Sequence, residues 1–116
     1  MHNFRKLTIW ELAIELAEEV YQTTSSIPSS EKYNLISQMC RAVVSIPSNI
    51  AEGAGRNTNG EFRQFLGIAL GSSYELETQV ILSTRLNYIC IEDSEKISSK
   101  ITLLQKKIYK FRQSIR

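Results

Sequence analysis

Apolar residues recur along the chain at spacings of three and four, the period of an amphipathic helix. The pattern is clearest near the C-terminus, where successive apolar positions are Ile97, Ile101, Leu104, Ile108, Phe111 and Ile115. This spacing predicts a helix with a heptad seam. The side chain of Asp93 or Ser94 can accept hydrogen bonds from the free N–H groups that open this helix.

A first helix is predicted from about Leu7 to Thr24, with one apolar stripe and an acidic opposite side. The stripe is formed by Trp10, Ala13, Ala17, Val20 and Thr24, and the acidic side by Glu11, Glu15, Glu18 and Glu19. Four nearby carboxylates suggest a metal cluster, but a helical-bundle site needs Glu-x-x-His pairs and the chain has only His2. A solvated acidic face is therefore favoured.

A second helix is predicted from about Glu31 to Gly53, after a segment with Pro28 and two serines that can cap it. At 100° per residue, its polar sector contains Ser37, Gln38, Arg41, Ser45, Ser48, Asn49 and Glu52. The apolar arc contains Ile36, Met39, Cys40, Ala42, Val43, Val44, Ile46, Pro47, Ile50 and Ala51. This arc is wider than one packing stripe, so it predicts a second apolar partner, either within the same bundle or in a neighbouring subunit.

Pro47 lies inside the second helix and lacks the N–H that would bond the carbonyl of Val43, so a kink is expected. The nearby side chains of Ser45, Ser48 and Asn49 can bond the carbonyls that the bend frees. Glu52 is expected to pair with Arg56, or with Arg41 through a third group. Gly53 and Gly55 are expected to end the helix in left-handed conformations.

A third helix is predicted to begin with the capping box Thr58-Asn59-Gly60-Glu61 and to reach about Leu86. Its core stripe is Phe62, Phe65, Leu66, Ala69, Ser73, Leu76, Val80 and Ser83. Gly67 and Gly71 interrupt it at GxxxG spacing, which suggests close approach to another helix. A phosphate-binding loop is excluded, because no strand precedes these glycines and no GK[ST] follows them.

Four helices joined by short loops predict an all-α fold: an antiparallel up-down-up-down bundle with a kinked second helix, in one domain over residues 1–116. No stretch is long and uncharged enough to span a membrane. The N-terminal segment leads into several glutamates, which a secretory signal would not contain, so a cytoplasmic location is expected. Cys40 and Cys90 lack CxxC spacing and are expected to be reduced, half-buried residues.

The net charge of +2 is unevenly distributed along the chain. Residues 95–116 carry seven basic residues and one acidic residue, a net charge of +6, whereas residues 1–94 carry seven basic and eleven acidic residues, a net charge of −4. A basic C-terminal segment fits either a solvated face that complements the helix dipole or a surface for polyanions.

Several motifs together resemble a known family over essentially the whole chain, beginning with Leu7-Thr8-Ile9-Trp10. They are Ser37-Gln38-Met39-Cys40-Arg41-Ala42, then Ser45-Ile46-Pro47-Ser48-Asn49-Ile50-Ala51-Glu52-Gly53 with Gly55-Arg56, and Glu61-Phe62 through Phe65-Leu66-Gly67-Ile68-Ala69 to Gly71-Ser72 and Glu75-Leu76-Glu77-Thr78-Gln79. The chain resembles the four-helix-bundle proteins encoded in intervening sequences of bacterial 23S rRNA genes. Cys40 departs from the arginine or lysine that such sequences more often have, which weakens a basic patch beside Arg41.

The resemblance implies a homo-oligomer, typically a barrel-like pentamer, with no known enzymatic activity, no cofactor and a suspected link to RNA. A related family member, the accessory protein of diversity-generating retroelements, works with a reverse transcriptase and its RNA template. The ribosomal label of the family is inherited from gene location. It does not imply membership of the ribosome.

These observations favour a non-catalytic oligomeric module that binds structured RNA or other nucleic acid through phosphate contacts. The candidate residues are Lys100, Lys106, Lys107, Lys110, Arg112 and Arg116, with Arg56 and Arg63 elsewhere. The alternative is a protein-protein adaptor, for example an accessory subunit to a reverse transcriptase or another RNA-bound partner. An enzyme is disfavoured, because one terminal histidine and dispersed carboxylates assemble no catalytic, metal or cofactor site. Structural roles are assigned to Arg41, Ser45, Pro47, Asn49, Glu52, Gly53, Gly55 and Gly71.

Overall fold

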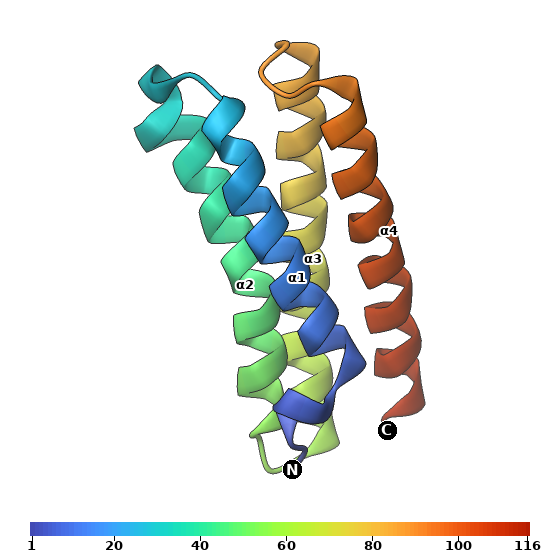
Figure 1. The fold of residues 1–116 in the computed structure, drawn as a ribbon. Coiled ribbons are helices and arrows are strands. Elements are labelled where there is room, and N and C mark those ends of the chain that lie inside the picture. The colour runs from blue at the N-terminus through green and yellow to red at the C-terminus, as the bar shows by residue number, and fades with distance from the viewer.

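The computed structural model describes residues 1–116 and contains four long helices. Their bounds are α1, Thr8–Thr23; α2, Ser37–Ala54; α3, Asn59–Arg85; and α4, Ile91–Ser114. Consecutive helices run in opposite directions, and both chain ends lie at the same end of the molecule as the α2–α3 connection (Figure 1). The predicted all-α, up-down-up-down four-helix bundle is confirmed.

A single cluster of 24 buried apolar side chains fills the space between the helices. The predicted seam of α4 is confirmed, because its members from Ile97 to Ile108 are at most 1% exposed. The predicted stripe of α3 is also buried, except for the half-buried Phe65. On α1 the core face is rotated from the prediction: Ile9 and Leu16 are buried, whereas Trp10 is half-buried and packs with Phe4 at the edge of the core.

Contacts within a single chain explain why the apolar arc of α2 is wide. Helix α2 packs against both α1 and α3, so two of its sides need apolar residues. Of the arc, Val44 alone is exposed, at 42%. The second apolar partner that the sequence predicted is therefore largely another face of the same bundle.

The start of α2 was predicted too early. A 3₁₀ turn at Ser29–Glu31 and a π-helical turn at Lys32–Ile36 come before the α-helix, which begins at Ser37. No serine side chain caps these turns. Within the π turn Leu35 is buried, so this segment meets the core through a wider turn than the period of an α-helix predicts.

Helix α2 continues through Pro47 to Ala54, and the kink stays a prediction. The polar side chains next to Pro47 form hydrogen bonds both within α2 and to α3. The Asn49 amide donates to the carbonyl of Ser45 at 2.8 Å and to its hydroxyl at 2.9 Å. That hydroxyl also bonds the hydroxyl of Ser72 on α3 at 2.8 Å. Ser45 therefore links α2 to α3 just before the proline, and Asn49, just after the proline, holds the Ser45 hydroxyl in place.

The prediction of left-handed glycines at the end of α2 was wrong. No glycine has a positive φ, and Gly55 ends the helix with φ −84°. Gly53 is needed for space instead, because a Cβ there would lie 2.6 Å from Cβ of Phe65 and 2.9 Å from Cδ1 of Phe62. Gly53 therefore lets α2 pack tightly against α3 at this point.

The GxxxG pair of α3 does not bring two helix backbones together within the chain. At Gly67 an added Cβ would meet only the guanidinium of Arg112, at 3.6 Å. At Gly71 nothing lies within 4 Å. Gly67 thus makes room for one side chain, and Gly71 lies on open surface.

Helix α3 has the predicted bounds to within one residue, whereas the start of α4 differs from the prediction. The capping box is confirmed: the Thr58 hydroxyl accepts from the N–H of Glu61 at 3.1 Å and donates to its carboxylate at 3.0 Å. After α3, Asn87 adopts a left-handed φ of 62° and α4 begins at Ile91. The predicted caps Asp93 and Ser94 were wrong, because both lie inside α4.

Candidate functional site

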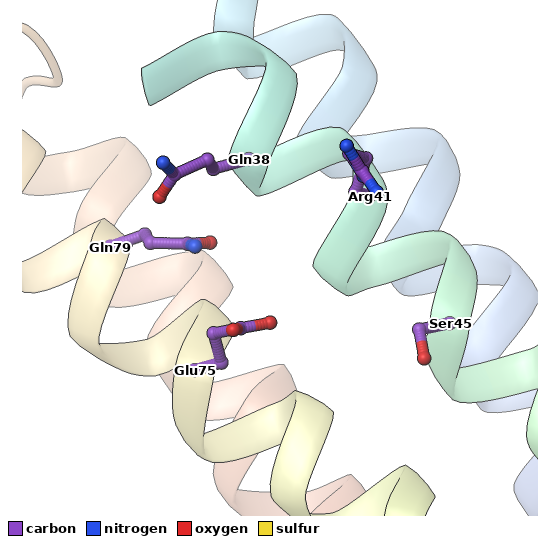
Figure 2. Close-up of a pocket in the computed structure, with 5 residues that line it drawn as sticks. All are labelled: Gln38, Arg41, Ser45, Glu75 and Gln79. Carbon is purple, nitrogen blue, oxygen red and sulfur yellow. The ribbon is translucent and has the colours of Figure 1, made fainter. Parts of the chain in front are cut away.

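A polar groove runs between α2 and α3 (Figure 2). It has a volume of about 460 Å³ and no apolar side chain in its lining. The lining residues are Gln38, Arg41 and Ser45 from α2 and Glu75 and Gln79 from α3. The spacings of three and four residues place each set on one side of its helix, so the two walls face each other.

The α2 wall is held in place by hydrogen bonds at one end and is free at the other. Ser45 is fixed by its bonds to Asn49 and Ser72. Gln38 and Arg41 are exposed, and Figure 2 shows the Gln38 amide pointing toward α3. The guanidinium of Arg41 forms no ion pair.

The α3 wall carries an unpartnered amide. Gln79 is 8% exposed, and its Oε1 is buried without a hydrogen-bond partner. Its side chain projects from α3 toward α2, as does the carboxylate of Glu75 one turn earlier (Figure 2). An orphaned buried acceptor costs about 1–3 kcal/mol, so stability alone does not account for glutamine at this position.

Replacing Gln79 by methionine is expected to raise the free energy of unfolding by about 1 kcal/mol, because the thioether fills a similar shape without an orphaned acceptor. Urea denaturation followed by circular dichroism measures this. The exposed Gln64 on the same helix provides the control, since Gln64→Met should change the value by less than about 0.5 kcal/mol. A loss of stability in Gln79→Met would show that the amide is hydrogen-bonded in solution.

Several of the predicted basic site residues are engaged inside the chain. Lys100 pairs with Glu19 of α1, and Lys96 lies 3.6 Å from the same carboxylate. The Arg112 side chain crosses Gly67 and donates to the carbonyl of Arg63 at 2.8 Å. Lys100 and Arg112 therefore join helices, and contribute less to a free basic surface than their charges suggest.

Arg56 and Arg63 also have neighbours within the chain. Arg56 pairs with Glu52 at 3.3 Å, as the sequence predicted, and its guanidinium lies 4.8 Å from the ring centre of Phe65. Glu52 makes no ion pair with Arg41. Arg63 is half-buried beside Arg112. Arg63 therefore lies against α4, whereas Arg56 is held beside the end of α2.

The remaining basic residues of the C-terminal segment are exposed and free of ion pairs: Lys106, Lys107 and Lys110 on α4, and Arg116 beyond its end. Lys107 and Lys110 line a shallow cleft with Thr8 at the beginning of α1. No side chain caps that helix start, so the positive end of the α1 dipole adds to the field of the two lysines. This corner brings two free lysines together with the start of α1, whose first turn also carries Glu11.

The groove contains residues that the sequence did not single out: Gln38 as a lining side chain, Glu75 and Gln79. The four-residue spacing of Glu75 and Gln79 was visible, but Gln79 lies directly beside Val80 of the core stripe. A polar residue at such an edge is usually solvated. Only the packing of α2 shows that this one is buried.

Both cysteines are free thiols, and the expectation that both are half-buried was wrong for Cys90, which is exposed. Cys40 is half-buried, and burial raises the pKa of its thiol above the ordinary value. A raised pKa reduces the thiolate fraction at neutral pH. No group of three or more His, Cys, Asp or Glu side chains is placed to hold a metal ion. None of the four helices has the length and apolar composition that crossing a membrane requires.

The fold and its surface define a small antiparallel four-helix bundle with a basic corner between α1 and α4. Residues 5–110 match the family described as 23S rRNA-intervening sequence proteins, and the chain belongs to that family. A crystal structure at 1.70 Å of a protein of unknown function from the S23 ribosomal protein family of Bacteroides thetaiotaomicron has the same fold, with a TM-score of 0.83 at 24% identity. The match covers 90% of this chain and 98% of that one. No curated protein matches the chain.

Proposed function

We propose that the chain is a non-catalytic, homo-oligomeric module of the cytoplasm that binds structured RNA or other nucleic acid through phosphate contacts. The observation that carries the proposal is the pair Lys107 and Lys110, exposed, unpaired and beside the uncapped start of α1. Lysines and helix N-termini are the groups that proteins use on phosphates. Lys106 on α4 and Arg116 beyond its end are further exposed cations of this segment.

Assembly strengthens this function. A symmetric oligomer repeats the basic corner on every subunit, so a weak phosphate surface becomes a multivalent one. Exposed apolar side chains suited to self-association occur along α3: Ile68 at 52%, Ile81 at 46%, Leu82 at 48% and Leu86 at 48%. The family resemblance favours five subunits.

The test is a filter-binding titration of a structured RNA at several salt concentrations. Lys107→Gln with Lys110→Gln should weaken binding about tenfold at ~100 mM salt and lower the slope of log K against log salt by about 1 to 2. Lys32→Gln with Arg85→Gln removes the same charge from exposed residues elsewhere and should leave most of the affinity intact. Binding that ignores salt, no binding below about 100 μM, or equal losses in the two double variants would contradict the proposal.

A second candidate function is a protein-protein adaptor, for example an accessory subunit to a reverse transcriptase or another RNA-bound partner. The exposed apolar residues of α3 favour it, because side chains that suit contact with a second copy also suit contact with another protein. Pull-down before and after nuclease treatment separates the two functions. A partner protein that stays bound without RNA supports the adaptor.

A further inference from the structure

We propose that the groove between α2 and α3 binds a small zwitterion that carries both an ammonium and a carboxylate, as a free α-amino acid does. The groove is lined by Gln38, Arg41, Ser45, Glu75 and Gln79. It shares no residue with the basic corner on α1 and α4. The proposal therefore does not depend on nucleic-acid binding.

The first argument is the placement of charge. Arg41 on α2 and Glu75 on α3 line the same groove from opposite walls (Figure 2). Their charged atoms lie more than 4.0 Å apart, since they form no ion pair with each other or with any other residue. A ligand with an anionic and a cationic end can satisfy both walls at once. A simple cation would face Arg41, and a simple anion would face Glu75.

The second argument is the unpartnered acceptor beside the carboxylate. Oε1 of Gln79 is buried without a hydrogen bond, and the side chain points into the groove one turn from Glu75 (Figure 2). An ammonium group has three N–H donors. It can bond the Glu75 carboxylate and the Gln79 oxygen together, while Arg41 takes the ligand carboxylate by its guanidinium fork.

The third argument is the character of the space. The volume of about 460 Å³ exceeds what an amino acid needs, and no apolar side chain lines it. An apolar ligand would gain little there. One positive and one negative residue give the lining no net charge, so a phosphate-rich ligand is not favoured over the α4 surface. A compact, polar, doubly charged ligand suits these properties.

The test uses the full chain and follows the side-chain amide signals of Gln79 and Gln38 by ¹⁵N nuclear magnetic resonance. Glycine, L-serine and L-glutamine are the probes. At least one should give a saturable shift of the Gln79 signal, with a dissociation constant of the order of 1 mM. Acetate and methylammonium, each carrying one charge, should bind at least about tenfold more weakly, and so should glycine betaine, which has no N–H donor.

Variants assign the shift to the groove. Arg41→Gln, Glu75→Gln and Gln79→Met should each weaken binding about tenfold, because each removes one hydrogen bond to a charged group. Arg85→Gln and Glu15→Gln alter exposed charges outside the groove and should leave binding unchanged. Circular dichroism of every variant is the control that checks for the helical fold.

Three results would overturn the proposal. One is the absence of any saturable Gln79 shift at about 50 mM of every amino acid tested. Another is binding of acetate or methylammonium as tight as that of the amino acids. The third is a pattern in the melting temperatures: Arg41→Gln, Glu75→Gln and the double variant all unfold at the same temperature, and that temperature is below that of the unmodified chain. This pattern would show that the two side chains pair with each other in solution.

Discussion

Replacing Phe62 by alanine is expected to lower the free energy of unfolding by about 3–5 kcal/mol. Phe62 is 1% exposed near the start of α3. Its ring centre lies 5.0 Å from that of His2 and 5.6 Å from that of Phe111, so the side chain joins the N-terminal segment to the end of α4. The substitution removes a large buried surface and leaves a cavity where three parts of the chain meet.

Urea denaturation monitored by circular dichroism measures the loss. Phe62→Leu keeps most of the volume and should cost less, about 1 to 2 kcal/mol, so a folded variant exists even if the alanine variant unfolds. Tyr74→Ala on the same helix removes a ring that is 55% exposed and should change stability by at most about 0.5 kcal/mol. Equal losses for Phe62→Ala and Tyr74→Ala would contradict the described packing.

The parts of the fold that sequence predicted well depend on local spacing. The stripe of α3 and the seam of α4 follow from the helical period, and the capping box uses residues three positions apart. Thr58 and Glu61 make the bonds that their spacing predicts. Such features need no knowledge of distant segments.

The boundaries that were predicted wrongly depend on distant or unusual contacts. Helix α4 begins before Asp93 because the chain reverses at the left-handed Asn87 and buries Ile89. Ser94 bonds the hydroxyl of Thr84 on α3 at 2.9 Å and does not cap its own helix. Residue type alone does not show whether a hydroxyl will cap its own helix or form a hydrogen bond with a neighbouring one.

The prediction of the candidate site is limited in the same way, because it too depends on contacts between distant residues. Charge counting located the basic segment, but it could not show that Lys100 pairs with Glu19, because the two residues are 81 positions apart. It could not show that Lys107 reaches the start of α1 either. The burial of Gln79 depends on how closely α2 and α3 approach, which no local pattern records. Pairing across helices therefore decides which polar residues stay available for binding.

Gly53→Ala is expected to lower the free energy of unfolding by about 2 kcal/mol, although alanine forms helices better than glycine. The added Cβ would lie 2.6 Å from Cβ of Phe65, an atom fixed to the α3 backbone, so the two helices must separate. Overpacking of this kind typically costs about 1–3 kcal/mol, more than the gain of about 1 kcal/mol in helix propensity.

The exposed Gly71 provides the matched control, because nothing lies within 4 Å of an added Cβ there. Gly71→Ala should therefore raise the free energy of unfolding by about 0.5–1 kcal/mol, the gain expected when helix propensity acts alone. Thermal and urea unfolding of the two variants should thus change in opposite directions. If Gly53→Ala were as stabilising as Gly71→Ala, α2 and α3 would have to lie farther apart at Gly53 than the structure places them.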